Sequence, residues 1–372
     1  MIYTNLGLSK LKVSKIGLGS LFQSQKNIVN KKFKSIINKS FDYGLNFIDT
    51  APVYGDGKIE KLIGSCLRHK RKQFIIATKN MPSKNRYNEL IKSANKSLLR
   101  LRTDYIDLYQ IHWPNHKIEV EETVDALKHL IKEGKIRYAG ICNSNLNDLI
   151  KYKKLLKSNL ISIQNEYNLF ERSYEKNLKT FINKNNMALI AYSPLSNGKL
   201  FNGKKEKEVL DFLEKKYQRS KSELILNWIT NQSQNIIAIP STLKIKNLVK
   251  NINSQNFQLN SFDKDLIDKY CRTKIQLINT NNIIIKKSKK NLFSSFTDAI
   301  KNKKNLDPSP QDLAKELNKT NLLKPIKLEM IKRKKKYILL DGNLRYWSWV
   351  ISKGNSKKIP SLVWKVNEKT KI

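Results

Sequence analysis

The feature that most limits the fold of this chain is an eight-fold alternation of short apolar runs with helical stretches, from about residue 16 to residue 252. The apolar runs lack the two-residue alternation of a half-exposed strand, which is typical of strands covered on both faces. Eight such units in about 250 residues favour a closed parallel (β/α)8 barrel, a TIM barrel, over an open sheet. No GxGxxG follows the first run, which argues against a doubly wound dinucleotide-binding fold. The expected strands are 16–20, a short one from 46 that ends on Asp49, 74–79, 105–112, 136–143, 161–167, 188–194 and 235–241, and residues 206–232 are expected to be helical.

Three successive predicted strands end on residues that can do chemistry. Asp49, Lys79 and His112 close these strands, and Tyr54 lies in the turn after Asp49. In a parallel barrel the carboxyl ends of the strands meet at one mouth, where the active site lies. A tyrosine with a pKa near 10 is a poor proton donor at neutral pH, but a nearby ammonium lowers that pKa. We therefore predict that Lys79 tunes Tyr54 and that Asp49 holds Lys79 in place.

The stretch 44–51, followed by Tyr54, Gly55 and Glu60, resembles the signature of the aldo-keto reductases over roughly residues 1–275. The resemblance implies an oxidoreductase that reduces an aldehyde or ketone, sugars included, with a nicotinamide cofactor. Tyr54 then protonates the carbonyl oxygen, while His112 orients the carbonyl group. The resemblance favours NADP as the cofactor, with NAD as the alternative. No metal is expected, because Pro114 prevents His112 and His116 from sharing a helical face.

The same resemblance implies a set of cofactor-binding residues. Asn143 and Gln164 hold the nicotinamide carboxamide, and Tyr192 stacks on the nicotinamide ring. Cys142 stands where the family usually has Ser, which implies one weaker contact. Ser241 stands where the family commonly has Lys or Gly, and Asn247 where it often has a basic residue that binds the 2′-phosphate, a role that Lys244 or Lys246 could take. The full set of implied cofactor-binding residues is Gly19, Ser20, Asp49, Asn143, Gln164, Tyr192, Ser193, Pro194, Leu195, Pro240, Ser241, Thr242, Lys246, Asn247 and Asn251.

The chain is strongly basic, with 72 Lys+Arg against 31 Asp+Glu and a formal net charge of +41. Either this excess forms a polyanion-binding surface, or lysine occupies solvated positions along the whole chain without a binding role. The three cysteines make no CxxC pair and no apolar run reaches 18 residues. These features predict a reduced, cytoplasmic protein without a membrane segment.

The composition changes after the predicted barrel domain, residues 1–278. A basic linker is expected over 279–306, and a small α+β domain over 307–372. Within it, the strand, turn and helix around 337–350 resemble the ParB-like and sulfiredoxin-type fold. That resemblance implies a phosphate or nucleotide site at Gly342, Asn343 and Arg345, although Leu344 stands where the family often has His or Arg. Arg345 either binds such a phosphate or pairs with Asp341.

Three functions remain open from the sequence. The first is a carbonyl reductase acting on a small molecule. In the second, the barrel is a scaffold and the C-terminal domain is a regulator that binds nucleotide or nucleic acid. The third joins these, with the C-terminal domain holding a phosphate on the substrate. The lysine-rich stretch 332–336 is either a solvated hairpin turn or a nucleic-acid patch.

Overall fold

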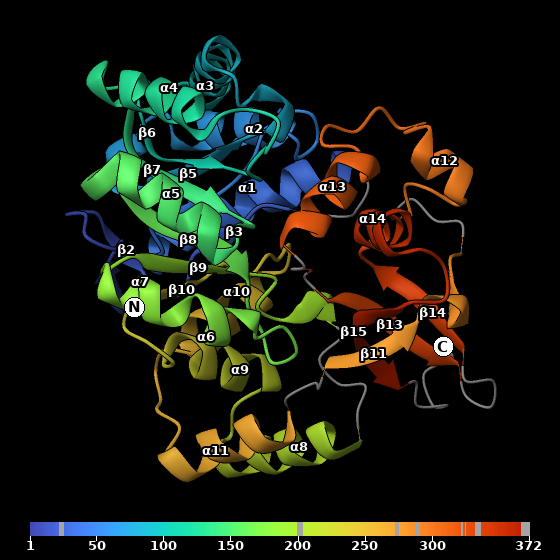
Figure 1. Cartoon of the computed structure of the whole chain (residues 1–372). Coiled ribbons are helices and arrows are strands. Elements are labelled where there is room, and N and C mark those ends of the chain that lie inside the picture. Colours follow the sequence, from blue (N-terminus) through green and yellow to red (C-terminus); the bar gives the residue numbers. More distant parts are fainter. Residues whose placement is uncertain are drawn as a thin grey trace. The chain divides into compact units, whose positions relative to one another are not determined.

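The computed structural model describes residues 1–21, 26–198, 204–271, 275–286, 291–320, 323, 325–331 and 336–365. The described residues form two compact units (Figure 1). The first is built from residues 1–198 and 212–264, and the second from those between 199 and 211 and from 265 onward. The predicted end of the barrel domain at residue 278 stays a prediction.

The first unit is the predicted (β/α)8 barrel. Its parallel strands follow chain order around the sheet, β10-β9-β8-β7-β6-β5-β4-β3. A parallel bridge between Ile16 and Ala238 joins the first strand region to the last, and the Gly17 amide donates to the Ala238 carbonyl at 2.8 Å, which closes the ring. The strands are β3 (Leu18–Gly19), β4 (Phe47–Asp49), β5 (Ile75–Asn80), β6 (Ile106–Ile111), β7 (Ile136–Cys142), β8 (Leu160–Glu166), β9 (Ala188–Tyr192) and β10 (Ile236–Ala238).

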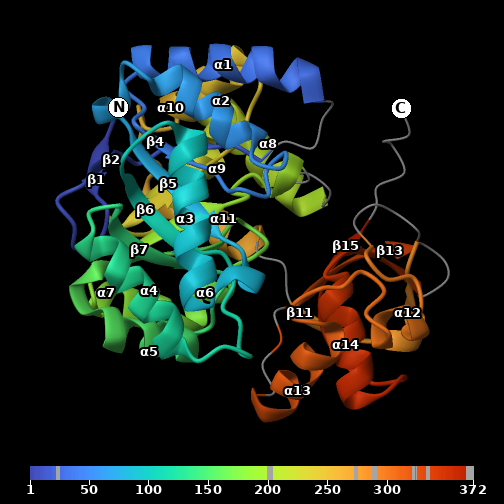
Figure 2. The ribbon, with the colours of Figure 1, turned by 90° about the horizontal axis from the view of Figure 1, so that it is seen from above.

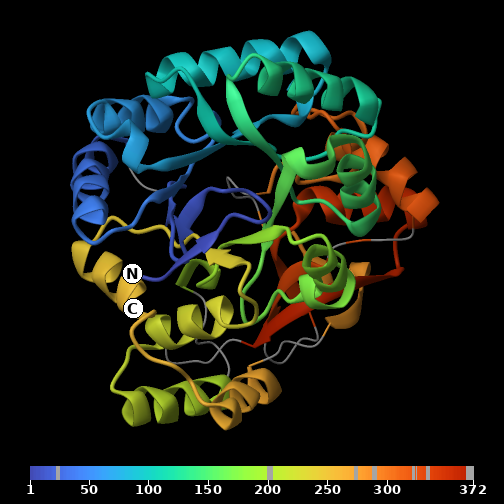
Figure 3. The ribbon, with the colours of Figure 1, turned by 90° about the vertical axis from the view of Figure 1, so that its left-hand side faces the viewer.

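Helices surround these strands, as Figure 3 shows. In α3, for example, Leu90, Ala94 and Leu101 lie on one buried face at helical spacing. The predicted helical region 206–232 consists of two helices, because Ser220 and Glu223 form a capping box that starts a new helix. The helices of the first unit are α1 (Lys26–Asp42), α2 (Lys58–Leu67), α3 (Tyr87–Leu101), α4 (Val120–Lys132), α5 (Leu146–Leu156), α6 (Ser173–Asn177), α7 (Lys179–Lys184), α9 (Lys221–Thr230) and α10 (Ile245–Asn253). The helices α8 (Lys204–Tyr217) and α11 (Ser261–Tyr270) are each divided between the two units.

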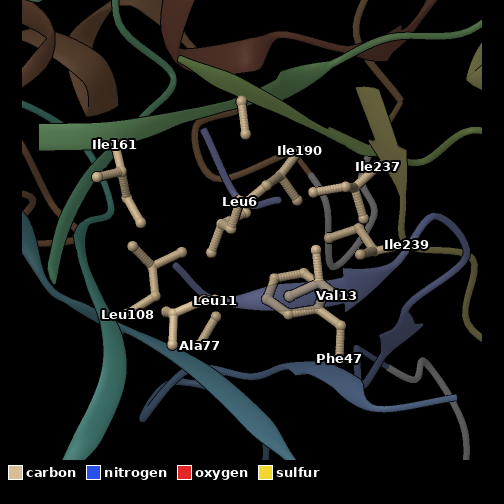
Figure 4. Close-up of a cluster of buried hydrophobic side chains, with 11 residues drawn as sticks. Leu6, Leu11, Val13, Phe47, Ala77, Leu108, Ile161, Ile190, Ile237 and Ile239 are labelled. Atoms are coloured by element: carbon tan, nitrogen blue, oxygen red, sulfur yellow. The ribbon is translucent and has the colours of Figure 1, made fainter. Parts of the chain in front are cut away.

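An antiparallel hairpin, β1 (Tyr3–Asn5) with β2 (Lys12–Ser14), precedes the barrel. Its side chains Leu6, Leu11 and Val13 join the strand residues in one buried cluster inside the barrel (Figure 4). Gly7 has φ +59°, and a Cβ there would lie 2.3 Å from the Ile161 carbonyl oxygen. Only glycine therefore allows the hairpin turn to approach β8 so closely.

The second unit holds a five-stranded sheet of order β11-β15-β13-β14-β12, with helices α12, α13 and α14 beside it (Figure 2). Ile326, Leu328, Trp347, Val350 and Ile359 form its buried core with neighbouring apolar residues. The elements are β11 (Ile275–Asn279), β12 (Ile283–Ile284), α12 (Phe296–Ile300), α13 (Pro310–Thr320), β13 (Ile326–Ile331), β14 (Lys336–Asp341), α14 (Asn343–Lys353) and β15 (Lys358–Lys365). The unit is the α+β arrangement expected for the C-terminal part.

The described residues of the predicted basic linker, 279–306, are part of the second unit, and the linker boundaries stay a prediction. Ile283 of β12 pairs with Tyr337 of β14, and Phe293 is 1% exposed within the core of the second unit. These apolar residues follow neither helical nor strand periodicity, so no signal in the sequence indicates that they are buried. Residues 332–335 of the predicted lysine-rich turn lie outside the described residues.

No helix in the described part of the chain is both long enough and apolar enough to span a membrane.

Candidate active site

The four predicted catalytic side chains meet at the carboxyl ends of neighbouring strands. Asp49 ends β4, Lys79 lies near the end of β5, His112 directly follows β6, and Tyr54 lies in the turn after β4. The Lys79 ammonium is fully buried and donates to Asp49 Oδ1 at 2.5 Å, to the Thr50 carbonyl at 2.9 Å and to the Tyr54 hydroxyl at 3.5 Å. The predicted grouping around Lys79 is therefore present in the structure.

The aromatic members of the group lie close to each other. The Tyr54 and His112 rings meet edge to face, with centroids 6.4 Å apart. The Trp113 ring stacks on His112 with centroids 3.9 Å apart, and Trp113 keeps 42% of its surface exposed. Trp113 was absent from the predicted site, although its position directly after the strand-end histidine placed it at the mouth. Its exposed ring offers an apolar wall beside the imidazole.

The prediction that Lys79 makes Tyr54 unusually acidic is wrong in its net result. Burial raises the pKa of Tyr54, the Lys79 ammonium acts in the opposite direction, and the Asp49 carboxylate adds to the rise. The ammonium therefore limits the rise in the pKa of the phenol without reversing it. Tyr54 consequently carries its proton at neutral pH, as a proton donor must.

Burial also decides the charge states of the other two partners. Burial, followed by the Lys79 ammonium, lowers the pKa of His112 to about 2, so the imidazole is neutral at neutral pH. For Lys79, burial alone lowers the pKa, but attraction to the Asp49 carboxylate is the largest effect that raises it, and the net pKa is raised. The site thus combines a charged lysine with a neutral histidine and a protonated tyrosine.

The second oxygen of Asp49 is held by two carboxamides. Gln110 Nε2 donates to Asp49 Oδ2 at 3.1 Å, and Gln164 Nε2 donates to the same oxygen at 2.7 Å. All three side chains are buried. The sequence predicted Gln164 only as a cofactor ligand and missed Gln110, whose one signal is a polar residue inside an apolar run.

Glu60 of the quoted signature has a structural position. It is fully buried and accepts from the Thr78 hydroxyl at 2.7 Å and from Arg100 Nε at 2.5 Å. These bonds join α2 to β5 and α3, directly behind the strand that carries Lys79. Glu60 therefore supports the site without reaching its mouth.

The three predicted nicotinamide ligands, Asn143, Gln164 and Tyr192, lie next to the catalytic group. Asn143 has φ +53°. Its side-chain Nδ2 donates to the His112 carbonyl at 3.0 Å, and the Tyr192 hydroxyl donates to Asn143 Oδ1 at 2.8 Å. Cys142 is buried, and burial raises the pKa of its thiol. Within the described part of the chain, the buried Ser20 hydroxyl and His112 Nδ1 have no hydrogen-bond partner. Polar atoms left unpaired at this mouth fit a polar ligand such as the predicted cofactor.

The residues predicted for the other end of the cofactor come from β3, the loops after β9 and β10, and α10. A Cβ on Gly19 would lie 2.6 Å from the Ile239 carbonyl and 2.7 Å from the Ser241 hydroxyl, so β3 and the loop after β10 are in tight contact. Thr242 accepts from the Lys244 amide at 3.1 Å just before α10. Ser193, Pro194 and Leu195 follow β9, Pro240 follows β10, Lys246 and Asn247 are exposed at the start of α10, and Asn251 is buried further along it.

The predicted phosphate ligands of the second unit have partners within the protein. Asn343 accepts from the Phe293 amide and donates to the Phe293 carbonyl, both at 2.9 Å. Arg345 donates to the Pro325 carbonyl at 2.8 Å and to Asp341 at 3.1 Å. Both polar ends of the Asn343 side chain are thus used to hold Phe293, and a phosphate site at Gly342, Asn343 and Arg345 stays a prediction. The alternative pairing of Arg345 with Asp341 is the one present.

In comparisons with known proteins, residues 15–271 match the Aldo/keto reductase family. The chain is 35% identical over 223 residues to Aldo-keto reductase YhdN of Bacillus subtilis, and 30% identical over 256 residues to Methylglyoxal reductase YeaE of Escherichia coli. The YhdN match covers 56% of this chain and 66% of that relative, just under two thirds of its length, whereas the YeaE match covers 68% and 89%.

Two solved structures resemble the chain. One is a thermostable aldo-keto reductase, Tm1743, in complex with the inhibitor epalrestat, with a TM-score of 0.69 and 30% identity over 73% of this chain and 100% of that one. The other is an aldo-keto reductase from Klebsiella pneumoniae in complex with NADPH, with a TM-score of 0.67 and 25% identity over 73% and 96%.

Proposed function

Because the chain belongs to the aldo/keto reductase family, we propose that it reduces an aldehyde or ketone to an alcohol with NADPH as the hydride donor. The observation that carries this proposal is the buried Lys79 ammonium, which bonds Asp49 at 2.5 Å and Tyr54 at 3.5 Å at the barrel mouth. When bound, the cofactor supplies a hydride to the carbonyl carbon. NADPH in the Klebsiella relative supports this choice of cofactor.

The side chains divide the remaining work. Tyr54 donates its proton to the carbonyl oxygen as the hydride arrives at the carbon, and solvent later returns a proton to the phenol. Lys79 stabilises the negative charge that develops on Tyr54 during this transfer, and Asp49 keeps Lys79 charged and in place. Neutral His112 orients the carbonyl oxygen by a hydrogen bond, because an uncharged imidazole can donate without giving up its proton.

For the cofactor, the proposed ligands fall at two ends of the mouth. Asn143, Gln164 and Tyr192 lie beside the catalytic group and would hold the nicotinamide ring and its carboxamide. Lys246 and its neighbours at the start of α10 would hold the phosphate of the adenosine end. Titration of the protein with NADPH and with NADH, followed by cofactor fluorescence, tests the preference for NADPH.

The experiment that tests the function uses the full chain, NADPH and a panel of aldehydes, ketones and sugars, with methylglyoxal first because YeaE is named for its reduction. Tyr54→Phe removes the proton donor but keeps the ring. General acid catalysis contributes about a hundredfold or more, so turnover is expected to fall by at least that factor while NADPH affinity stays unchanged. Unchanged turnover in this variant would refute the role of Tyr54.

For the second unit we propose a ParB-like fold, supported by β14, the turn at Gly342 and α14 in that order. A crystal structure of the chain, compared with ParB-like domains, tests this assignment. A cytoplasmic location is also proposed, supported by the three widely separated cysteines, which make no CxxC pair in the sequence. Fractionation of the native host cells tests it.

A further inference from the structure

Gln110 is buried deep in the barrel and is not among the expected catalytic or cofactor residues. It is 0% exposed, so it cannot touch a substrate at the mouth. Its neighbour across the ladder on β5 is Lys79, and its neighbour on β7 is Gly140. Neighbouring residues of a parallel ladder project to the same side of the sheet, so Gln110 points to the same side as Lys79.

The interior leaves space for this side chain only because Gly140 lacks one. A Cβ on Gly140 would lie 2.9 Å from Gln110 Cγ and 2.7 Å from the Ser162 hydroxyl on β8. Any larger residue there would displace Gln110 from its place beside Asp49.

The hydrogen bonds of Gln110 form a closed triangle with the two groups it touches. Gln110 Nε2 donates to Asp49 Oδ2 at 3.1 Å, and Gln110 Oε1 accepts from Gln164 Nε2 at 3.4 Å. Gln164 Nε2 also donates to Asp49 Oδ2 at 2.7 Å. An ionised carboxylate only accepts, so both carboxamides must turn their NH2 groups toward Asp49. Both N–H groups of Gln164 are therefore used, and its Oε1 is the atom left for a ligand.

We propose that Gln110 is a positioning residue that fixes both the Asp49 carboxylate and the amide orientation of Gln164, and so couples the Lys79–Tyr54 group to the nicotinamide end of the site. The inference rests on the carbonyl reductase function proposed above. Through Asp49 it affects the catalytic rate, and through Gln164 it affects cofactor affinity. It contributes nothing to the affinity for the carbonyl substrate, which it does not touch.

The first test is Gln110→Met, which keeps the length of the side chain but removes its donor and acceptor. Loss of a hydrogen bond to a charged group is expected to lower kcat about tenfold, with the KM for the carbonyl substrate unchanged. Loss of the ordered Gln164 amide is expected to weaken NADPH binding about threefold, measured by cofactor fluorescence without any substrate. Equal kcat and equal NADPH affinity in the variant and the unchanged protein would overturn the proposal.

The matched control is Asn227→Leu. Asn227 is also a buried carboxamide, but it bonds the Ser254 and Phe257 carbonyls, away from Asp49. This control is expected to lower the melting temperature while kcat and NADPH affinity stay unchanged. A fall of kcat in Asn227→Leu as large as in Gln110→Met would show that loss of any buried amide has this effect, and would overturn the proposal.

A second variant, Gln110→Glu, tests the hydrogen bond itself. A protonated glutamic acid keeps a donor for Asp49 and an acceptor for Gln164, whereas the ionised form repels Asp49. Its kcat relative to the unchanged protein is therefore expected to rise as pH falls, and a ratio that does not change with pH contradicts the proposal. If NADPH binds but no carbonyl compound is reduced, the proposed function fails. The role of Gln110 is then tested only by the expected threefold loss of NADPH affinity in Gln110→Met. If NADPH does not bind at all, both fail together.

Discussion

Replacing Asp49 by Asn leaves the Lys79 ammonium buried without its counter-ion. The pair lies at 2.5 Å with side chains 1% and 3% exposed, so water cannot take the place of the lost carboxylate. Removing one partner of a buried ion pair costs about 3–5 kcal/mol. We expect the free energy of unfolding of Asp49→Asn, measured by urea denaturation at pH 7, to fall by an amount in this range.

The pH dependence of this loss identifies its cause. In the unchanged protein the pKa of Lys79 is raised above its unfolded value, so its stabilising contribution is fully present below the unfolded pKa of about 10.4 and is lost only at higher pH. In Asp49→Asn, burial lowers the pKa of Lys79 below that value. The folded variant then binds fewer protons than the unfolded chain, so its stability rises with pH, by at most about 1.4 kcal/mol per pH unit.

The assay is therefore a series of urea denaturations from pH 6 upward, all below the unfolded pKa of about 10.4. The difference in stability between the two proteins is expected to shrink as pH rises. The double variant Asp49→Asn with Lys79→Met is expected to recover part of the loss at pH 7, because no unpaired charge remains. A stability difference that is small at pH 7, or constant over the whole series, would refute the reasoning.

Two further predictions concern groups that the structure places outside the chemistry. Glu60→Gln weakens the hydrogen bonds to Thr78 and Arg100. It is expected to lower the free energy of unfolding by about 1.5–3 kcal/mol and to leave kcat unchanged. A lower kcat with unchanged stability would assign Glu60 to the reaction instead. Asn343→Ala leaves the buried Phe293 amide and carbonyl unpaired and is expected to cost about 2–4 kcal/mol. Faster amide exchange at Phe293, measured by mass spectrometry on the folded chain, checks it, and unchanged exchange contradicts it.

The barrel and the grouping of Asp49, Tyr54, Lys79 and His112 follow from the sequence, because strand ends in a parallel barrel meet at one mouth. Gln110 does not follow, because its importance depends on the empty space at Gly140 on the next strand, which no spacing within one strand reveals. The direction of the Tyr54 pKa also needed the structure, since the outcome depends on how far burial outweighs a neighbouring charge. In the second unit, the turn at 341–345 has the residue types of a phosphate site, yet the structure gives Asn343 and Arg345 partners within the protein.

The hairpin at the start of the chain has a consequence for how the protein is made. Leu6, Leu11 and Val13 leave the ribosome well before Ile190 and Ile237, which share their cluster. The bridge that shuts the ring joins Ile16 to Ala238, 222 positions further on (238 minus 16). Their partners do not yet exist when these residues are made, so the hairpin segment stays exposed until the last barrel strand is synthesised. It is the stretch that a chaperone would have to shield until the last strand emerges.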